Sequence, residues 1–222
     1  VAALVLIEGE DHLERRHVDV QIGEVAGHRG DRSRLEQALH ADGHPDVVAA
    51  LQWVYNNKAA YNIKVVNLSM NSSVAQSYHT SPLAAACEIL WFNSVVVVVS
   101  AGNNGTATLY PPANDPFVIT VGATDDRNTV DLADDVIGSF SAYGLDETGR
   151  TKPDLVAPGK NLIAYLPDTS LLTISVQYPQ NQVDKTYFRM SGTSMSAPVV
   201  SGAVALLMQK AQETGANLTP DQ

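Results

Sequence analysis

Residues 191–198 form the segment best suited to chemistry. They read Ser-Gly-Thr-Ser-Met-Ser-Ala-Pro and stand directly before an apolar stretch with helical composition. A serine at the start of a helix lies near unpaired backbone N–H groups and the positive end of the helix dipole, and both stabilise negative charge. Gly192 permits close approach, and Pro198 is expected in the first turn, where no hydrogen bond is lost. The pattern predicts Ser194 as a nucleophile, although serine is also a favoured helix cap.

A second polar segment, residues 100–105, follows five consecutive valines at positions 95–99. Attack on a carbonyl carbon produces an oxyanion, and a side-chain amide held after a rigid strand can donate a hydrogen bond to it without reorganising. Asn103 is therefore a candidate oxyanion donor. The composition of the segment, Ser-Ala-Gly-Asn-Asn-Gly, is also typical of a simple turn.

The motif at residues 192–198 is similar to the nucleophile motif of the subtilisin-like serine proteases. Three further segments resemble the same family in the family's order. Residues 65–69 resemble the strand bordering the substrate cleft, residues 100–103 the oxyanion loop, and residues 152–159 a structural turn. The resemblance covers residues 42–222, roughly four-fifths of the chain by motif matching. It implies Ser194 as nucleophile, Asn103 as oxyanion donor, and substrate contacts from Ser69, Met70, Asn71, Ser100, Ala101 and Gly102.

The cleft strand departs from the family pattern. Many members carry Ser-Leu-Gly-Gly where this chain has Ser-Met-Asn-Ser at residues 69–72. Glycines without side chains let an extended peptide lie close to the strand. Because they are absent, substrate binding by strand addition is not expected to follow the family pattern.

The other two members of a catalytic triad have no recognisable motif. The family's Asp-Thr-Gly and His-Gly-Thr-His segments are missing, and a serine hydroxyl is a weak nucleophile without a base and an orienting partner. In one hypothesis the chain is a fragment or a degenerate member that begins after the acid. In the other, Glu8 stands where the family has its aspartate and His28 is the base. The rival bases are His12, His17, His40 and His44, none with the confident paired spacing of a zinc site.

Charge and cysteine content exclude several classes of function. The formal net charge of −10 and the isoelectric point near 4.9 disfavour a general binder of nucleic acids or anionic membranes. Cys87 is the only cysteine, so neither an intramolecular disulfide nor a four-thiolate metal site can form, and its apolar surroundings predict a buried, inert thiol. The longest apolar runs, such as residues 95–99, are too short to cross a bilayer.

Calcium is the one metal that the composition suggests. An acidic cluster could hold a structural calcium ion, and its members are Asp125, Asp126, Asp131, Asp134 and Asp135. The cluster lacks the alternating acidic loop with a glycine hinge, which favours a solvated loop. The predicted chemistry itself requires no cofactor.

Hydrophobic periodicity predicts alternating strands and helices. The expected helices cover residues 45–58, 81–92 and 196–212, the last ended by Gly215, and the expected strands cover residues 1–7, 63–69, 95–99, 117–122, 154–159 and 162–166. Residues 171–189 are expected to be a hairpin or an insertion. Five valines in a row suit a strand buried on both faces. The pattern predicts a three-layer α/β/α domain with a mostly parallel sheet, subtilisin-like, and its active site at the carboxyl ends of the strands.

One domain is expected over residues 1–222, with a divergent segment at 1–41, a family-like core at 42–222, and an end or both ends incomplete. The predicted function is a serine hydrolase that cleaves peptide or ester bonds through an acyl-enzyme. The alternatives are an esterase on the same scaffold and a catalytically silent binding module. The resemblance implies a secreted protein, although the sequence shows no export signal. The oligomeric state is left open.

Overall fold

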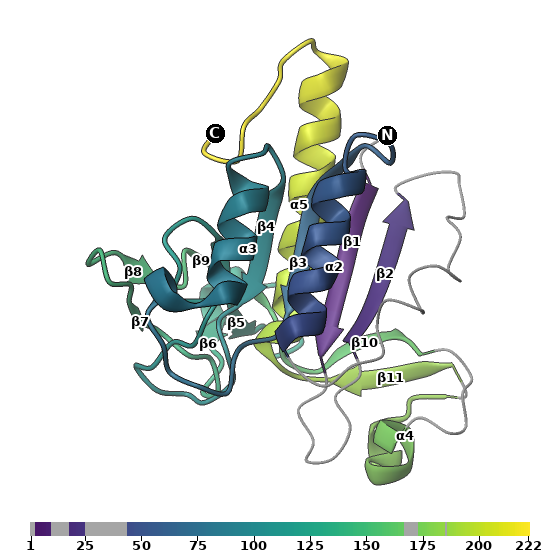
Figure 1. The fold of residues 1–222 in the computed structure, drawn as a ribbon. Coiled ribbons are helices and arrows are strands. Elements are labelled where there is room, and N and C mark those ends of the chain that lie inside the picture. Colours follow the sequence, from purple (N-terminus) through teal and green to yellow (C-terminus); the bar gives the residue numbers. More distant parts are fainter. Residues whose placement is uncertain (1–2, 10–17, 25–43, 167–172, 185) are drawn as a thin grey trace.

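The computed structural model describes residues 3–9, 18–24, 44–166, 173–184 and 186–222, and these residues build a seven-stranded sheet (Figure 1). The strand order is β2-β1-β3-β4-β5-β6, and β9 also pairs with β5. The parallel strands are β1 (Ala3–Gly9), β3 (Ile63–Ser69), β4 (Val96–Ser100), β5 (Ile119–Asp125) and β9 (Leu155–Pro158). The strands β2 (Val18–Glu24) and β6 (Val136–Ile137) run antiparallel to their partners.

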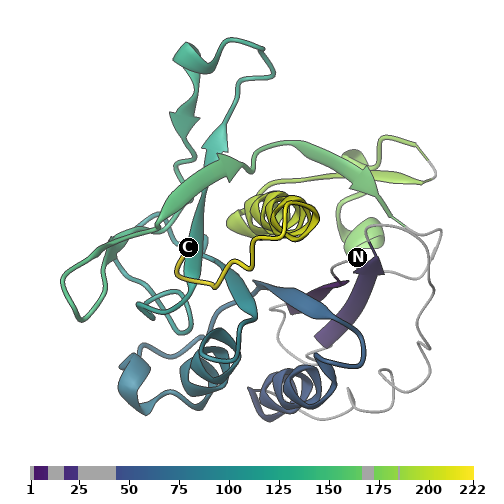
Figure 2. The same ribbon diagram turned by 90° about the horizontal axis from the view of Figure 1, so that it is seen from above.

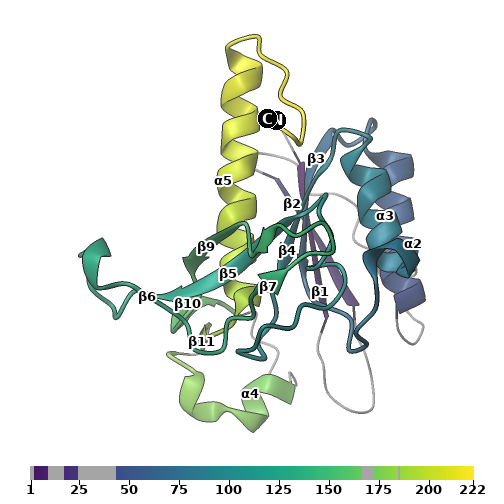
Figure 3. The ribbon, with the colours of Figure 1, turned by 90° about the vertical axis from the view of Figure 1, so that its left-hand side faces the viewer.

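Helices cover both faces of this sheet. Figures 1 and 3 show α2 (His44–Asn57) and α3 (Pro82–Trp91) side by side on one face and α5 (Thr193–Glu213) on the other. Figure 2, seen from above, shows the strands lying between the two helical layers. The predicted three-layer α/β/α architecture with a mostly parallel sheet is therefore confirmed.

The valine strand β4 connects the two halves of the core. Val97 and Val99 pack into a cluster with α2 and α3, whereas Val96 and Val98 pack into a second cluster with α5. Successive side chains of a strand point to opposite faces, so a strand buried on both faces needs apolar residues at every position. This arrangement is the one that the valine run predicts.

Short elements complete the described chain. Two small antiparallel pairs form, β7 (Gly144–Leu145) with β8 (Thr151–Lys152) and β10 (Leu162–Tyr165) with β11 (Tyr187–Met190). The segment expected as a hairpin or insertion contributes β11 and a short helix α4 (Thr173–Gln177). Three 3₁₀ turns are η1 (Tyr78–Thr80), η2 (Leu132–Asp134) and η3 (Pro179–Asn181). Within the described residues, no helix has the length and apolarity needed to span a membrane.

The start of α5 differs from the prediction. The helix begins at Thr193, so Pro198 lies inside it and not in its first turn. Proline has no N–H, and a proline at this depth removes the bond that its backbone would make to the carbonyl four residues earlier. That carbonyl belongs to Ser194, and the hydroxyl of Ser69 donates to it instead at 2.9 Å.

The single cysteine lies where its sequence context predicts. Cys87 is fully buried in α3 and packs in the core cluster beneath α2. Burial raises the pKa of its thiol well above the usual value, and the nearby carboxylates of Asp115 and Glu88 add to the effect. A thiol that stays protonated is a poor nucleophile, so Cys87 is a packing residue.

Candidate active site

The carboxyl ends of β3 and β4 meet the first turn of α5, and Ser194 lies at this junction. The Ser194 hydroxyl is half-buried and donates to the backbone carbonyl of Ser69 at 3.3 Å. In return, the Ser69 hydroxyl donates to the Ser194 carbonyl at 2.9 Å. The two serines therefore hold the last residue of β3 and the second residue of α5 together through a reciprocal pair of bonds.

Asn103 lies beside this pair, in the turn after β4. Its Oδ1 accepts hydrogen bonds from the Thr193 backbone N–H at 2.9 Å and from the Thr193 hydroxyl at 3.1 Å. Only an oxygen can accept from a backbone N–H, so these bonds fix which end of the amide faces Thr193. The donor Nδ2 lies 3.3 Å from the point where a Cβ on Gly192 would stand. Asn103 is thus exposed, and its amide is held by its oxygen on the residue that precedes Ser194.

Gly102 completes the contact between the turn and the helix. Its N–H donates to the Thr193 hydroxyl at 3.1 Å, and its φ of +109° is a conformation that residues with a side chain rarely adopt. Thr193 is fully buried, and its hydroxyl accepts from the Gly102 N–H and donates to Asn103 Oδ1. No role is predicted for Thr193 from the sequence, although it stands between two residues of the nucleophile motif.

The residues predicted to line the substrate cleft are only partly brought together. Asn71 occupies a position where the family has glycine, and its Nδ2 donates to the Ser100 carbonyl at 2.8 Å, which joins the ends of β3 and β4. Ser69 and Gly102 lie at the same junction. By contrast, Met70 packs against the core cluster on the α2 side, and Ala101 is buried with its N–H bonded to β5.

The turn after β9 supports the start of α5 from below. The Gly192 N–H donates to the Gly159 carbonyl at 2.8 Å, and the Ser196 hydroxyl donates to the Ala157 carbonyl at 3.0 Å. A Cβ on Gly159 would collide with the Ser196 hydroxyl and with Ala123. Glycine at position 159 is therefore a condition for the close packing that holds Ser194 in place.

The predicted acid, Glu8, is placed at the same edge of the sheet through its backbone. It lies near the end of β1, opposite Ser69 in the parallel register between β1 and β3. Neighbouring strands lie about 4.8 Å apart, so Glu8 belongs to the strand next to the one that contacts Ser194. Its role as the acidic partner stays a prediction.

The identity of the general base also stays a prediction. His28 lies outside the described residues, as do its rivals His12, His17 and His40, whereas His44 is the first residue of α2. Among the side chains that the structure describes, none donates to or accepts from the Ser194 hydroxyl, whose one partner there is the Ser69 carbonyl.

The acidic segment proposed for calcium uses its carboxylates locally. Asp125 forms an ion pair with Lys160 at 2.5 Å, which lowers the pKa of Asp125 chiefly through the bond from that lysine. Asp131 caps η2, and Asp134 accepts a bond from the Thr129 hydroxyl. No group of three or more acidic, histidine or cysteine side chains is placed to hold a metal ion in the described parts of the chain. A structural calcium ion at this segment stays a prediction.

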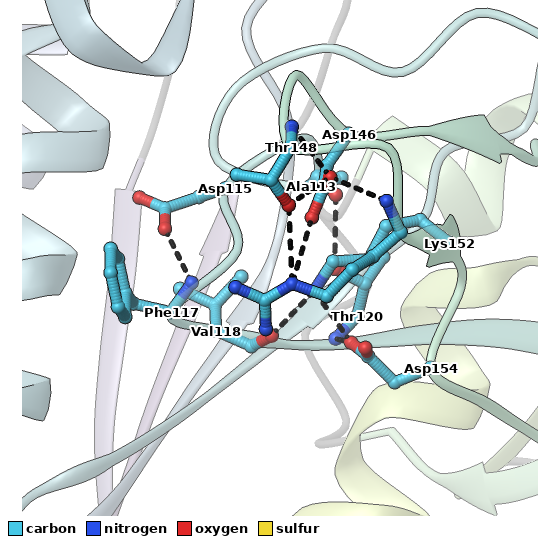
Figure 4. Close-up of polar contacts among 10 residues, drawn as sticks. Ala113, Asp115, Phe117, Val118, Thr120, Asp146, Thr148, Lys152 and Asp154 are labelled. Carbon is cyan, nitrogen blue, oxygen red and sulfur yellow. Dashed lines mark hydrogen bonds and ion pairs between the residues drawn. The ribbon is translucent and has the colours of Figure 1, made fainter.

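A charged network lies at the predicted structural turn of residues 152–159, between β5 and β9 (Figure 4). The ammonium group of Lys152, which is 1% exposed, donates to the Val118 carbonyl at 2.8 Å and to Asp154 at 2.7 Å. The same Asp154 oxygen accepts the Thr120 N–H. These contacts pin the backbone that carries the turn beneath α5, which gives the Lys-Pro-Asp sequence a structural role.

Comparison with known proteins agrees with this geometry. The model of the Subtilase family matches residues 26–222. The chain is 36% identical over 184 residues to serine protease AprX of Bacillus subtilis, which covers 80% of the chain and 40% of AprX. It is 34% identical over 164 residues to the extracellular serine proteinase of a Thermus species, covering 73% and 32% respectively. The solved structure of the prenylagaramide maturation protease PagA superposes with a TM-score of 0.58 at 25% identity, over 81% of the chain and 56% of PagA.

The chain thus spans 32% to 56% of the length of these three proteins. The family match covers five of the seven strands, the turn at Asn103 and the helix at Ser194, and it leaves out β1 and β2. The resemblance recognised from the motifs is therefore confirmed, and the chain belongs to the subtilase family.

Proposed function

We propose that this chain carries the nucleophile and the oxyanion donor of a serine peptidase that hydrolyses peptide bonds through an acyl-enzyme. The observation that carries the proposal is the junction of Ser194 and Asn103, where a hydroxyl in the first turn of a helix lies beside an amide whose oxygen is held by Thr193. The relatives in the comparison are named as serine proteases.

Each group at the junction has one chemical task. The Ser194 hydroxyl attacks the carbonyl carbon and passes its proton to a base. The Nδ2 of Asn103 donates to the oxygen on which negative charge develops, and the start of α5 adds the positive end of its dipole. Because Thr193 already holds the amide by its oxygen, Asn103 needs no reorganisation when charge appears.

The base is proposed to come from the segment before α2, with His28 as the first candidate and Glu8 as its acidic partner. The backbone of β1 supports Glu8 as the acidic partner, since Glu8 pairs with Ser69 in the register of β1 and β3. Replacing each of the candidate histidines by alanine and measuring turnover from pH 5 to 9 identifies the base. Loss of activity in one variant alone, together with loss of the acidic limb of the profile, is the expected result.

Casein digestion and hydrolysis of a short p-nitrophenyl ester test the function together. Release of soluble peptides by the wild-type chain and none by Ser194→Ala is the result expected of a peptidase. Ester hydrolysis without casein digestion would replace this proposal with an esterase, because esters need less help to expel their leaving group. Absence of both activities would leave a binding module.

The extracellular name of the Thermus relative supports a secreted location for this protein as well. Expression of the complete protein in its host and assay of the culture medium and the cell fraction tests this. Activity confined to the cell fraction would contradict it.

A further inference from the structure

The carbonyl of Ser194 lacks the donor that an ordinary helix would give it. Residue 198 is a proline within α5, so no backbone N–H is present one turn later to bond this carbonyl. The hydroxyl of Ser69, at the end of β3, takes that place at 2.9 Å. The first turn of α5 is thus held by a side chain from the sheet.

A buried chain of hydrogen bonds fixes the direction of this contact. Asn67 Nδ2 donates to the Ser69 hydroxyl oxygen at 2.9 Å, and the Ser201 hydroxyl, which is equally close to the Ala197 carbonyl, donates to Asn67 Oδ1 at 2.9 Å. Asn67 and Ser201 are fully buried, and Ser69 is 5% exposed. Because Ser69 accepts from Asn67, its only hydrogen is free to point to the Ser194 carbonyl.

We propose that Asn67 is a positioning residue for Ser194, and that it acts through the Ser69 hydroxyl. The side-chain amide of Asn67 connects β3 with α5 at two points. It accepts directly from Ser201, and it reaches the Ser194 carbonyl through the Ser69 hydroxyl. It thereby sets the position of the nucleophile relative to β3 and to the neighbouring Asn103. This inference rests on the proposed function, because it assumes that Ser194 reacts.

The rate at which a fluorophosphonate labels Ser194 measures this positioning. In Ser69→Ala and in Asn67→Ala, labelling is expected to slow about 10- to 100-fold, because a shift of about 1 Å in a reacting group has effects of this size. Turnover should fall with an unchanged KM, since the Ser69 hydroxyl is bonded to the Ser194 carbonyl and Asn67 is fully buried. Thr120→Val is the matched control, because it removes another fully buried hydroxyl, bonded to the Ala113 carbonyl, away from Ser194. This control should label at the wild-type rate.

A rescue experiment separates positioning from a general loss of packing. Pro198→Ala restores a backbone N–H that can bond the Ser194 carbonyl, so it should speed labelling in the Ser69→Ala background at least about threefold while having little effect alone. Equal labelling rates in the folded wild type and Ser69→Ala would overturn the proposal. A double variant no faster than Ser69→Ala would also overturn it.

A failure of the proposed function gives a different result from a failure of the positioning proposal. If Ser194 is not a nucleophile, the wild type itself is not labelled, and hydrogen exchange of residues 193–197 provides the readout. Faster exchange in Asn67→Ala and Ser69→Ala than in Thr120→Val supports the structural link without any chemistry. Equal exchange in all three variants overturns it.

Discussion

At the start of α5 the polar groups around Ser194 are neutral, whereas Lys152 and its partner Asp154 are charged, and the lysine of that pair is buried. Asn103 is exposed, and its Oδ1 is held by Thr193. Lys152 is 1% exposed, and its ammonium group is bonded to a carbonyl and a carboxylate. Both regions pin loops at the end of the sheet, but only the first leaves a donor and a hydroxyl for a substrate.

The contrast extends to two buried carboxylates. Asp146 accepts bonds from Thr148 and Arg150, and although burial works against its ionisation, these bonds lower its pKa below the usual value. Asp115 is fully buried and, within the described part of the chain, accepts one bond, from the Phe117 N–H, at 2.7 Å. Burial raises the pKa of Asp115 to about 7. Bonding, and not burial alone, decides which carboxylate stays charged.

The first prediction concerns stability at Lys152. Lys152→Met leaves the buried Val118 carbonyl without its donor, and an unsatisfied buried acceptor typically costs about 1–3 kcal/mol. The Asp154 carboxylate is 39% exposed, so water replaces the lysine there and the loss of this bond adds little. Urea denaturation monitored by circular dichroism measures the change. Arg150→Met is the control, because its contact with Asp146 is long, at 3.8 Å, and the arginine is 60% exposed. A Lys152 variant as stable as the Arg150 variant would contradict the structural role.

At Asn103 the main effect is expected on turnover. Asn103→Ala should lower turnover about 100- to 1000-fold, as is typical for the loss of one oxyanion donor. It should also cost about 1–3 kcal/mol of stability, because the buried Thr193 N–H and hydroxyl lose their acceptor. Steady-state kinetics on casein or an ester provides the measurement. The neighbouring Asn104, which bonds only within its own turn, offers the matched Asn104→Ala control. A rise in KM with unchanged kcat would mean that Asn103 binds substrate without stabilising the oxyanion.

The third prediction is a pH dependence of stability from Asp115. In the unfolded chain its pKa returns to about 3.8, so folding takes up a proton between that pH and about 7, and stability falls as pH rises through this window. Glu88 and Asp146 raise the folded pKa further, and Lys152 opposes them. The wild type should therefore lose about 2–3 kcal/mol of unfolding free energy between pH 5 and pH 9 that Asp115→Asn does not lose. Equal pH slopes in urea denaturation would show that Asp115 is already ionised in the folded protein.

The sequence predicts the elements whose apolar pattern is strong. The expected strand at residues 63–69 coincides with β3, and the valine run forms β4. The predicted start of the last helix, residue 196, lies three residues after the observed start of α5 at Thr193, because Pro198 suggests a first turn. The N–H that Pro198 lacks is replaced by the hydroxyl of Ser69, which is distant in sequence. No local sequence pattern predicts such a hydrogen-bond partner. The roles of Thr193 and Asn67 likewise depend on contacts between β3, the turn after β4 and α5.

The candidate base shows where sequence reasoning ends. Five histidines fall within residues 12–44, and their spacing does not distinguish the one that would meet Ser194, because that choice depends on tertiary position. The charge of Asp115 could not be predicted either, since a lone aspartate in a Pro-rich turn gives no local sign of full burial.

Mapping the adduct of a fluorophosphonate by mass spectrometry tests most directly whether Ser194 is an activated nucleophile. The wild-type chain should carry a single adduct on the peptide that contains Ser194, formed far more slowly in Asn103→Ala and not at all in Ser194→Ala. An adduct on a different serine, or hydrolysis that survives in Ser194→Ala, would contradict the assignment.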